Sequence, residues 1–136
     1  MERALKEYVW LKNGAYLVIQ PTEALTVVDV NSGKYSAKTK KKSAETYLKI
    51  NLEAAEELVR QIGLRNLSGM IIVDFINLKE KAEEEQLVSA LKKYIQQENT
   101  EIVYVDMTRL GLVELTRKKN GKTLRELFAD GRKEEV

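Results

Sequence analysis

Two aspartates stand where predicted strands end, and their side chains are the ones best suited to chemistry. Asp29 follows the apolar run of TVVDVN, and Asp74 follows that of GMIIVDF. Ligand groups gather beyond the carboxyl ends of strands joined by helical crossovers, so these carboxylates could converge. Left alone, such a pair repels, and one member tends to keep its proton. A hard cation such as Mg²⁺ removes the conflict, because it takes one or two carboxylates and completes its shell with water and phosphate.

Asn31 lies two residues after Asp29, so in an extended chain both side chains project from the same face. Its amide could donate to the carboxylate and fix its orientation. A structural interpretation competes, because Asp and Asn favour turns and DVNSG would serve as one without any chemistry. Asp74 could equally satisfy backbone donors, and Asp106 ends a third predicted strand. Spacing alone does not choose among these interpretations.

The composition limits which mechanisms are available. The chain has 136 residues, no histidine, no cysteine and a net charge of only +2. Catalysis without imidazole or thiolate must use carboxylates, amines, hydroxyls or a metal held by oxygen. The lack of cysteine excludes disulfides and thiolate zinc sites, and it suits a cytoplasmic protein. No apolar run reaches the roughly 18 residues that a membrane span needs, so we expect no membrane association.

Basic residues form two clusters, one just after Asn31 and one near the end of the last predicted strand. Such clusters contact nucleic-acid phosphates, although a charge run is also common in a solvated loop. Position favours the first cluster, which begins within a few residues of the candidate ligands. Tyr35 could stack on a base or simply pack in a strand. The clusters comprise Lys34, Lys38, Lys40, Lys41 and Lys42, and then Arg117, Lys118, Lys119 and Lys122.

The hydrophobic pattern predicts the elements that must position these residues. Strands are predicted at residues 15–20, 25–31, 69–75, 101–107 and 111–119, and a short link at Pro21 makes the first two a hairpin. The run at 69–75 is typical of a strand buried on both faces. Residues 1–12 form a charged, amphipathic lead-in segment, and a short helix and a polar tail follow Gly121.

Two long helices are predicted to cover this sheet. Ser43 is a candidate N-cap for the first, and Gly63 is its predicted end. Asn77 is a candidate cap for the second. The order of elements predicts an α/β (α+β) fold, with a mixed sheet of about five strands. The residues expected to face inward are Leu48, Leu52, Ala55, Val59 and Ile62 in the first helix, and Leu87, Leu91, Tyr94 and Ile95 in the second.

Three blocks of sequence resemble the catalytic core of the ribonuclease E/G family. They read GAYLVIQPTEALTVVDVNSGK, INLEAAEELVRQIGLRNLSGMIIVDFINL and LGLVELTRKK. The resemblance implies that family's deoxyribonuclease-I-like subdomain, with its two metal-holding aspartates at Asp29 and Asp74. It places the family's orienting asparagine at Asn31. The implied cofactor is Mg²⁺, with Mn²⁺ as a substitute.

The resemblance also implies an activity, that of an endoribonuclease acting in RNA processing and decay. The family hydrolyses single-stranded, A/U-rich RNA to 5′-phosphate and 3′-hydroxyl products, often preferring a 5′-monophosphate end. A metal-bound water attacks in line, which agrees with a chain that has no histidine. The family's dimer contact lies in this subdomain, so a homodimer is a further expectation.

Departures from the family pattern qualify these expectations. The family's zinc link uses a Cys-x-x-Cys motif, and this chain has no cysteine, so no zinc is expected. The OB-fold, the 5′-phosphate sensor and the ribonuclease-H-like part are also missing, so we assign residues 1–128 to one catalytic subdomain and 129–136 to a polar tail. Asn77 replaces a family aspartate, and Asp106 has no counterpart and is taken as structural. The alternative is a non-catalytic RNA-binding or dimerisation module, since losing substrate-positioning domains could remove most of the rate.

Overall fold

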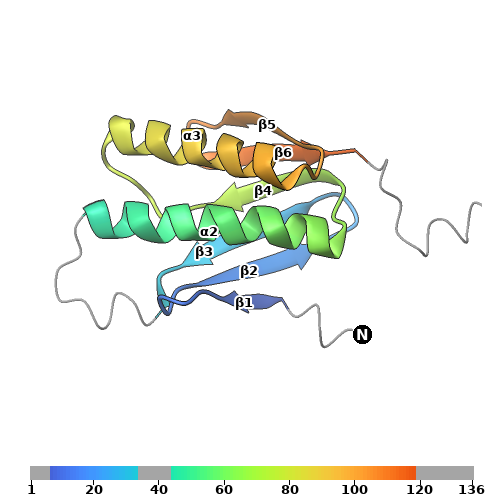
Figure 1. Ribbon diagram of the computed structural model, residues 1–136, viewed down its shortest axis with the longest axis horizontal. Helices are drawn as coiled ribbons and strands as arrows, with labels where there is room; N and C mark the ends of the chain where they lie inside the picture. The colour runs from blue at the N-terminus through green and yellow to red at the C-terminus, as the bar shows by residue number, and fades with distance from the viewer. Residues whose placement is uncertain (1–6, 34–43, 119–136) are drawn as a thin grey trace, which may run out of the picture.

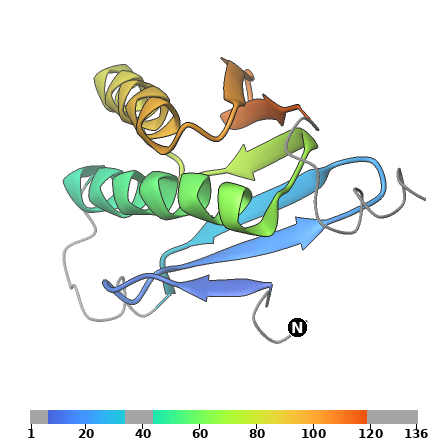
Figure 2. The same cartoon turned by 45° about the vertical axis from the view of Figure 1, so that its right-hand side comes forward.

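The computed structural model describes residues 7–33 and 44–118. Within them, six strands form one mixed sheet in the order β1-β2-β3-β4-β6-β5, and two helices lie on one of its faces (Figures 1 and 2). The predicted α+β class is therefore confirmed. The strands are β1 Tyr8–Trp10, β2 Tyr16–Pro21, β3 Thr26–Asn31, β4 Gly69–Asp74, β5 Ile102–Met107 and β6 Leu112–Arg117, and the helices are α2 Ala44–Arg65 and α3 Lys81–Glu98.

One parallel pairing matters most for the arrangement of this sheet. β3 and β4 run parallel, with α2 between them in the chain, whereas the other neighbouring strands are antiparallel. The predicted β2–β3 hairpin is confirmed, and its turn is closed by the Thr22 N–H donating to the Leu25 carbonyl at 2.8 Å. Because parallel strands end at the same edge, the carboxyl ends of β3 and β4 lie side by side.

The core lies between the sheet and the two helices. The predicted stripe of α2 faces it, with Ala55, Val59 and Ile62 fully buried and Leu48 and Leu52 partly buried. No helix in residues 7–33 and 44–118 is both long and apolar enough to cross a membrane. The largest fully buried side chains include Leu17, Ile19, Val28, Ile71, Val73 and Leu115 from the strands, and Ile50, Leu58, Ile62, Leu87 and Leu91 from the helices.

The opposite face of the sheet has no helix on it among the described residues, and this overturns one prediction. β4 is not buried on both faces: Ile71 and Val73 are fully buried, but Met70 and Asp74 are exposed. β3 alternates in the same way, with Val28 buried and Val27 exposed. We call this uncovered side the open face. The predicted lead-in segment, residues 1–12, also contains a strand that the sequence analysis missed, since β1 pairs with β2 and extends the sheet.

Both predicted helix boundaries based on glycine and asparagine were wrong. α2 passes through Gly63 to Arg65, and the residue that ends it is Asn66, at φ 54°. Gly63 serves packing instead, because a Cβ there would come within 2.8 Å of the Thr100 side chain. α3 begins after Glu80 rather than after Asn77. The predicted cap Ser43 and the predicted helix after Gly121 lie outside the described residues.

Candidate active site

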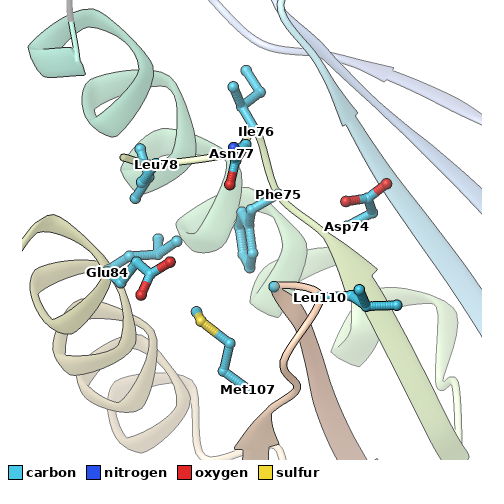
Figure 3. A pocket seen from close by; sticks show the side chains of 10 residues that line it. Asp74, Phe75, Ile76, Asn77, Leu78, Glu84, Met107 and Leu110 are labelled. Carbon is cyan, nitrogen blue, oxygen red and sulfur yellow. The ribbon is translucent and has the colours of Figure 1, made fainter. Parts of the chain in front are cut away.

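Asp29 and Asp74 lie directly opposite each other at the ends of β3 and β4. The parallel register pairs their Cα atoms, so they are separated by one strand spacing, about 4.8 Å. Their neighbours Val28 and Val73 point into the core, so both carboxylates project from the open face. Figure 3 shows the Asp74 carboxylate turned toward the ribbon of β3. The structure thus brings together the two carboxylates that the sequence singled out.

The electrostatics of this pair suit a hard cation. Partial burial, and then repulsion from Asp74, raise the pKa of the Asp29 carboxyl above its ordinary value. A divalent ion shared by the two groups would relieve the repulsion, and carboxylate oxygens are the ligands that Mg²⁺ prefers. Among the described residues no cluster of three or more acidic, histidine or cysteine side chains forms a metal site. A cation at Asp29 and Asp74 would complete its shell with water or substrate, which is the habit of Mg²⁺.

Asn31 projects from the open face like Asp29, one pleat further along β3. Its Oδ1 accepts a hydrogen bond of 2.8 Å from the Gly33 N–H, which makes it a turn residue as the structural interpretation expects. The same bond fixes the amide plane and leaves Nδ2 as the donor for a carboxylate. Gly33 is needed at this turn, because its φ is 52° and a Cβ would lie 2.6 Å from the Gly14 carbonyl oxygen.

Asn51 is a site-supporting residue that the sequence analysis missed. Its fully buried amide donates to the Ile76 carbonyl at 2.8 Å and accepts from the Ile76 N–H at 3.0 Å. Ile76 is two residues beyond Asp74, so α2 holds the chain as it leaves β4. The available signal was a polar residue three positions after Leu48 and four before Ala55, on the apolar face of the helix.

The two described residues of the second basic cluster, Arg117 and Lys118, lie at the other end of the sheet from the carboxylates. Arg117 pairs with Gly69, the first residue of β4, whereas Asp74 is the last. Its guanidinium donates to the Thr100 carbonyl at 2.6 Å, the Asn66 Oδ1 at 2.7 Å and the Leu67 carbonyl at 2.9 Å, and so ties three loop positions together. The structure does not bring Arg117 or the adjacent Lys118 to the carboxylates. The remaining candidates, Lys34, Lys38, Lys40, Lys41, Lys42, Lys119 and Lys122, and also Tyr35, lie outside the described residues.

Among the described residues, no third carboxylate joins the pair to form a metal-holding group. Asp106 lies on the edge strand β5 opposite Glu114, and its charge raises the pKa of the Glu114 carboxyl. A cavity of about 90 Å³ borders the end of β4, lined by residues that include Phe75 and Met107. In Figure 3 Phe75 points toward Met107, whereas the Asp74 carboxylate points away from both. Asp74 is itself one of the residues that line this cavity, but its carboxylate turns away from Phe75 and Met107 and toward the open face.

The arrangement defines a mixed-sheet domain with a pair of carboxylates on one face, and sequence comparison assigns the chain to a family. The sequence model of the ribonuclease E/G family matches residues 1–120, so the chain belongs to this family. It is 43% identical over 130 residues to ribonuclease E of Nostoc sp., covering 96% of this chain and 19% of that protein. It is 44% identical over 128 residues to ribonuclease E of Synechocystis sp., covering 94% and 19%.

A more distant relative extends the comparison to ribonuclease G. The chain is 33% identical over 130 residues to ribonuclease G of Escherichia coli K12, covering 96% of this chain and 26% of that protein. The chain therefore spans between 19% and 26% of the length of these relatives. The expected family is confirmed, and the domain is one that occurs within ribonucleases.

Proposed function

We propose that the chain is the catalytic subdomain of a Mg²⁺-dependent endoribonuclease that hydrolyses single-stranded, A/U-rich RNA to 5′-phosphate and 3′-hydroxyl products. The observation that carries the proposal is the pairing of Asp29 with Asp74 across β3 and β4 on the open face. Membership of the ribonuclease E/G family supports it, since the relatives are named as ribonucleases. A homodimer through this subdomain is part of the same proposal.

The residues of this chain contribute position and charge. Asp29 and Asp74 would hold Mg²⁺ or Mn²⁺, and Asn31 would orient the Asp29 carboxylate through its amide. When bound, the ion supplies charge stabilisation at the phosphoryl group and lowers the pKa of water. Because both aspartates stand on hydrogen-bonded strands, their carboxylates need little rearrangement to bind. Lys34 and the lysines between residues 38 and 42 contact RNA phosphates in this proposal.

Calorimetric titration of Mn²⁺ into the metal-free chain tests the ligands. We expect Asp29→Asn and Asp74→Asn each to weaken binding by at least about tenfold, since each removes one of two anionic ligands. Asp106→Asn is the matched control, because it neutralises an aspartate near the end of another strand and should leave affinity unchanged. Equal affinity for wild type and Asp29→Asn would remove the metal site from the proposal.

Cleavage of a 5′-monophosphorylated, single-stranded, A/U-rich RNA tests the activity. We expect slow cleavage that Asp74→Ala abolishes, with 5′-phosphate and 3′-hydroxyl ends on the products. The rate should be low because the chain spans only 19% of the cyanobacterial relatives, and substrate positioning contributes much of catalysis. Cleavage that persists in Asp74→Ala would contradict the assignment.

The second candidate is the alternative expected from the sequence, a non-catalytic RNA-binding or dimerisation module. This function predicts RNA affinity or self-association without turnover at any Mg²⁺ concentration. Filter binding and size-exclusion chromatography, run beside the cleavage assay, separate the two candidates.

A further inference from the structure

The open face carries an aromatic cluster, and one of its members stands in the same row as the carboxylate pair. β1 pairs with β2 so that Tyr8 stands opposite Val18 and Trp10 opposite Tyr16. Val18 in turn stands opposite Asp29, and Asp29 opposite Asp74. Tyr8 and the two aspartates thus belong to one row across the sheet. Since β1 lies two strand spacings from β3, the row places Tyr8 roughly 10 Å from Asp29.

The Tyr16 ring contacts both Tyr8 and Trp10, and the Tyr8 and Trp10 rings remain open to solvent. The ring centres of Trp10 and Tyr16 are 4.6 Å apart, and those of Tyr8 and Tyr16 are 5.6 Å apart. Tyr8 is 53% exposed and Trp10 is 59% exposed, which is unusual for side chains of this size. In β2, Leu17 follows Tyr16 and is fully buried on the helix side of the sheet. Because neighbouring side chains of a strand alternate, Tyr16 projects from the open face. In Figure 1 these residues belong to the blue strands at the lower edge of the sheet.

The surroundings favour nucleic acid over a protein partner. The polar residues Asn31, Asp29 and Asp74 follow the cluster across the face, whereas the core of a protein interface is depleted in charged residues. Gly33 lies two residues beyond the end of β3, and a Cβ added there would lie 3.1 Å from the Tyr16 ring. The sequence that continues from Gly33 carries five lysines between residues 34 and 42, which complement phosphate charge.

We propose that Tyr8, Trp10 and Tyr16 form a stacking surface for bases of single-stranded RNA beside the carboxylate pair. The inference rests on the proposed function and adds a substrate-binding subsite to it. Stacking on aromatic rings is tolerant of sequence, because every base has a π-face. The surface binds bases of the RNA strand that lie close to the phosphate positioned at Asp29 and Asp74.

Trp10 is the only tryptophan in the chain, so its fluorescence reports this surface directly. The probe is an A/U-rich octaribonucleotide, titrated in EDTA so that no metal site is needed. We expect saturable quenching of tryptophan emission. An abasic sugar-phosphate of the same length should quench little, because it carries the charge without the bases. Binding of the octamer, seen by anisotropy of an end label, without any change in Trp10 emission would overturn the proposal.

Substitutions separate stacking from folding. Trp10→Leu should weaken octamer binding about tenfold, as expected for the loss of one stacked base, and Trp10→Phe should restore most of it. Val105→Ala is the matched control, since it trims an exposed apolar residue on the opposite edge strand and should leave affinity unchanged. Circular dichroism establishes that each variant is folded. Equal affinity for folded Trp10→Leu and wild type would overturn the proposal.

The experiment also distinguishes this inference from the proposed function. Cleavage that depends on Asp74 but leaves Trp10 emission and the affinity of Trp10→Leu unchanged would refute the stacking surface alone. Quenching in EDTA without any cleavage in Mg²⁺ would support the surface and refute the enzyme. Self-association that Trp10→Leu abolishes, with no effect of RNA on emission, would make a second copy the occupant and overturn the proposal.

Discussion

The buried amide of Asn51 should control both the stability of the domain and the position of Asp74. It makes two hydrogen bonds to the backbone of Ile76, at 2.8 and 3.0 Å. Asn51→Leu keeps the side-chain size but leaves the N–H and the carbonyl of Ile76 without this partner. An unsatisfied buried polar group costs about 1–3 kcal/mol. Because Ile76 is only half-buried, we expect the two groups together to cost about 2–4 kcal/mol.

Thermal unfolding followed by circular dichroism measures this effect. For a domain of this size, about 4 °C of midpoint corresponds to 1 kcal/mol, so Asn51→Leu should lower the midpoint by about 8–16 °C. Asn77→Leu is the matched control, because it makes the same change at an exposed position one residue beyond Ile76. It should change the free energy of unfolding by less than about 0.5 kcal/mol.

Two further measurements test the reasoning. Asn51→Asp keeps an acceptor for the Ile76 N–H but sets a carboxylate against its carbonyl, so its loss of stability should grow as the pH rises and the carboxylate ionises. Well below the melting temperature, Asn51→Leu should bind Mn²⁺ several-fold more weakly than wild type, because the end of β4 is less well fixed. A midpoint for Asn51→Leu within about 2 °C of wild type would refute the role of this amide.

Three more predictions follow from the site and its surroundings. The pKa of Asp29 is raised in the folded state, so ionisation of this carboxyl lowers the free energy of unfolding. The domain is therefore more stable at low pH, where Asp29 is protonated, and loses this stability as the pH rises through the folded pKa. In EDTA at pH 7, Asp29→Asn should therefore raise the free energy of unfolding by about 1 kcal/mol, the repulsion expected between two charges one strand spacing apart near water. A lowered midpoint in denaturation curves would show that repulsion is not significant. Gly33→Ala should destabilise by at least about 1 kcal/mol, because its φ is 52° and a Cβ would meet the Gly14 carbonyl oxygen, and urea denaturation measures this loss. Arg117→Met should cost about 2–3 kcal/mol by the loss of three hydrogen bonds while leaving RNA affinity in filter binding unchanged; weakened binding by the folded variant would return Arg117 to the RNA interface.

Several features of the fold could be predicted because they depend on short-range pattern. The alternation of Val28 and Asp29 in β3 and the stripe of Ala55, Val59 and Ile62 in α2 identify a strand and a helix. The order of elements then indicates a mixed sheet covered by helices. Helix ends were less predictable. Gly63 does not end α2, and a glycine is required there because a Cβ would meet the side chain of Thr100, a residue far away in the sequence.

The sequence by itself determined which residues can do chemistry. Without histidine or cysteine, the choice reduces to oxygen ligands, and the family pattern selects Asp29, Asp74 and Asn31 among them. The sequence could not show that Arg117 binds loop carbonyls rather than phosphate, because a basic residue looks the same in a sequence in either role.

Only the tertiary structure decided how these residues are placed. Strand order and register depend on pairing between segments more than 40 residues apart, and they put Asp29 opposite Asp74 rather than beside Asp106. They also align Tyr8 with the carboxylates through β2. Because a shift of one residue in register would turn a whole strand over, the composition of the open face is a property of the assembled sheet.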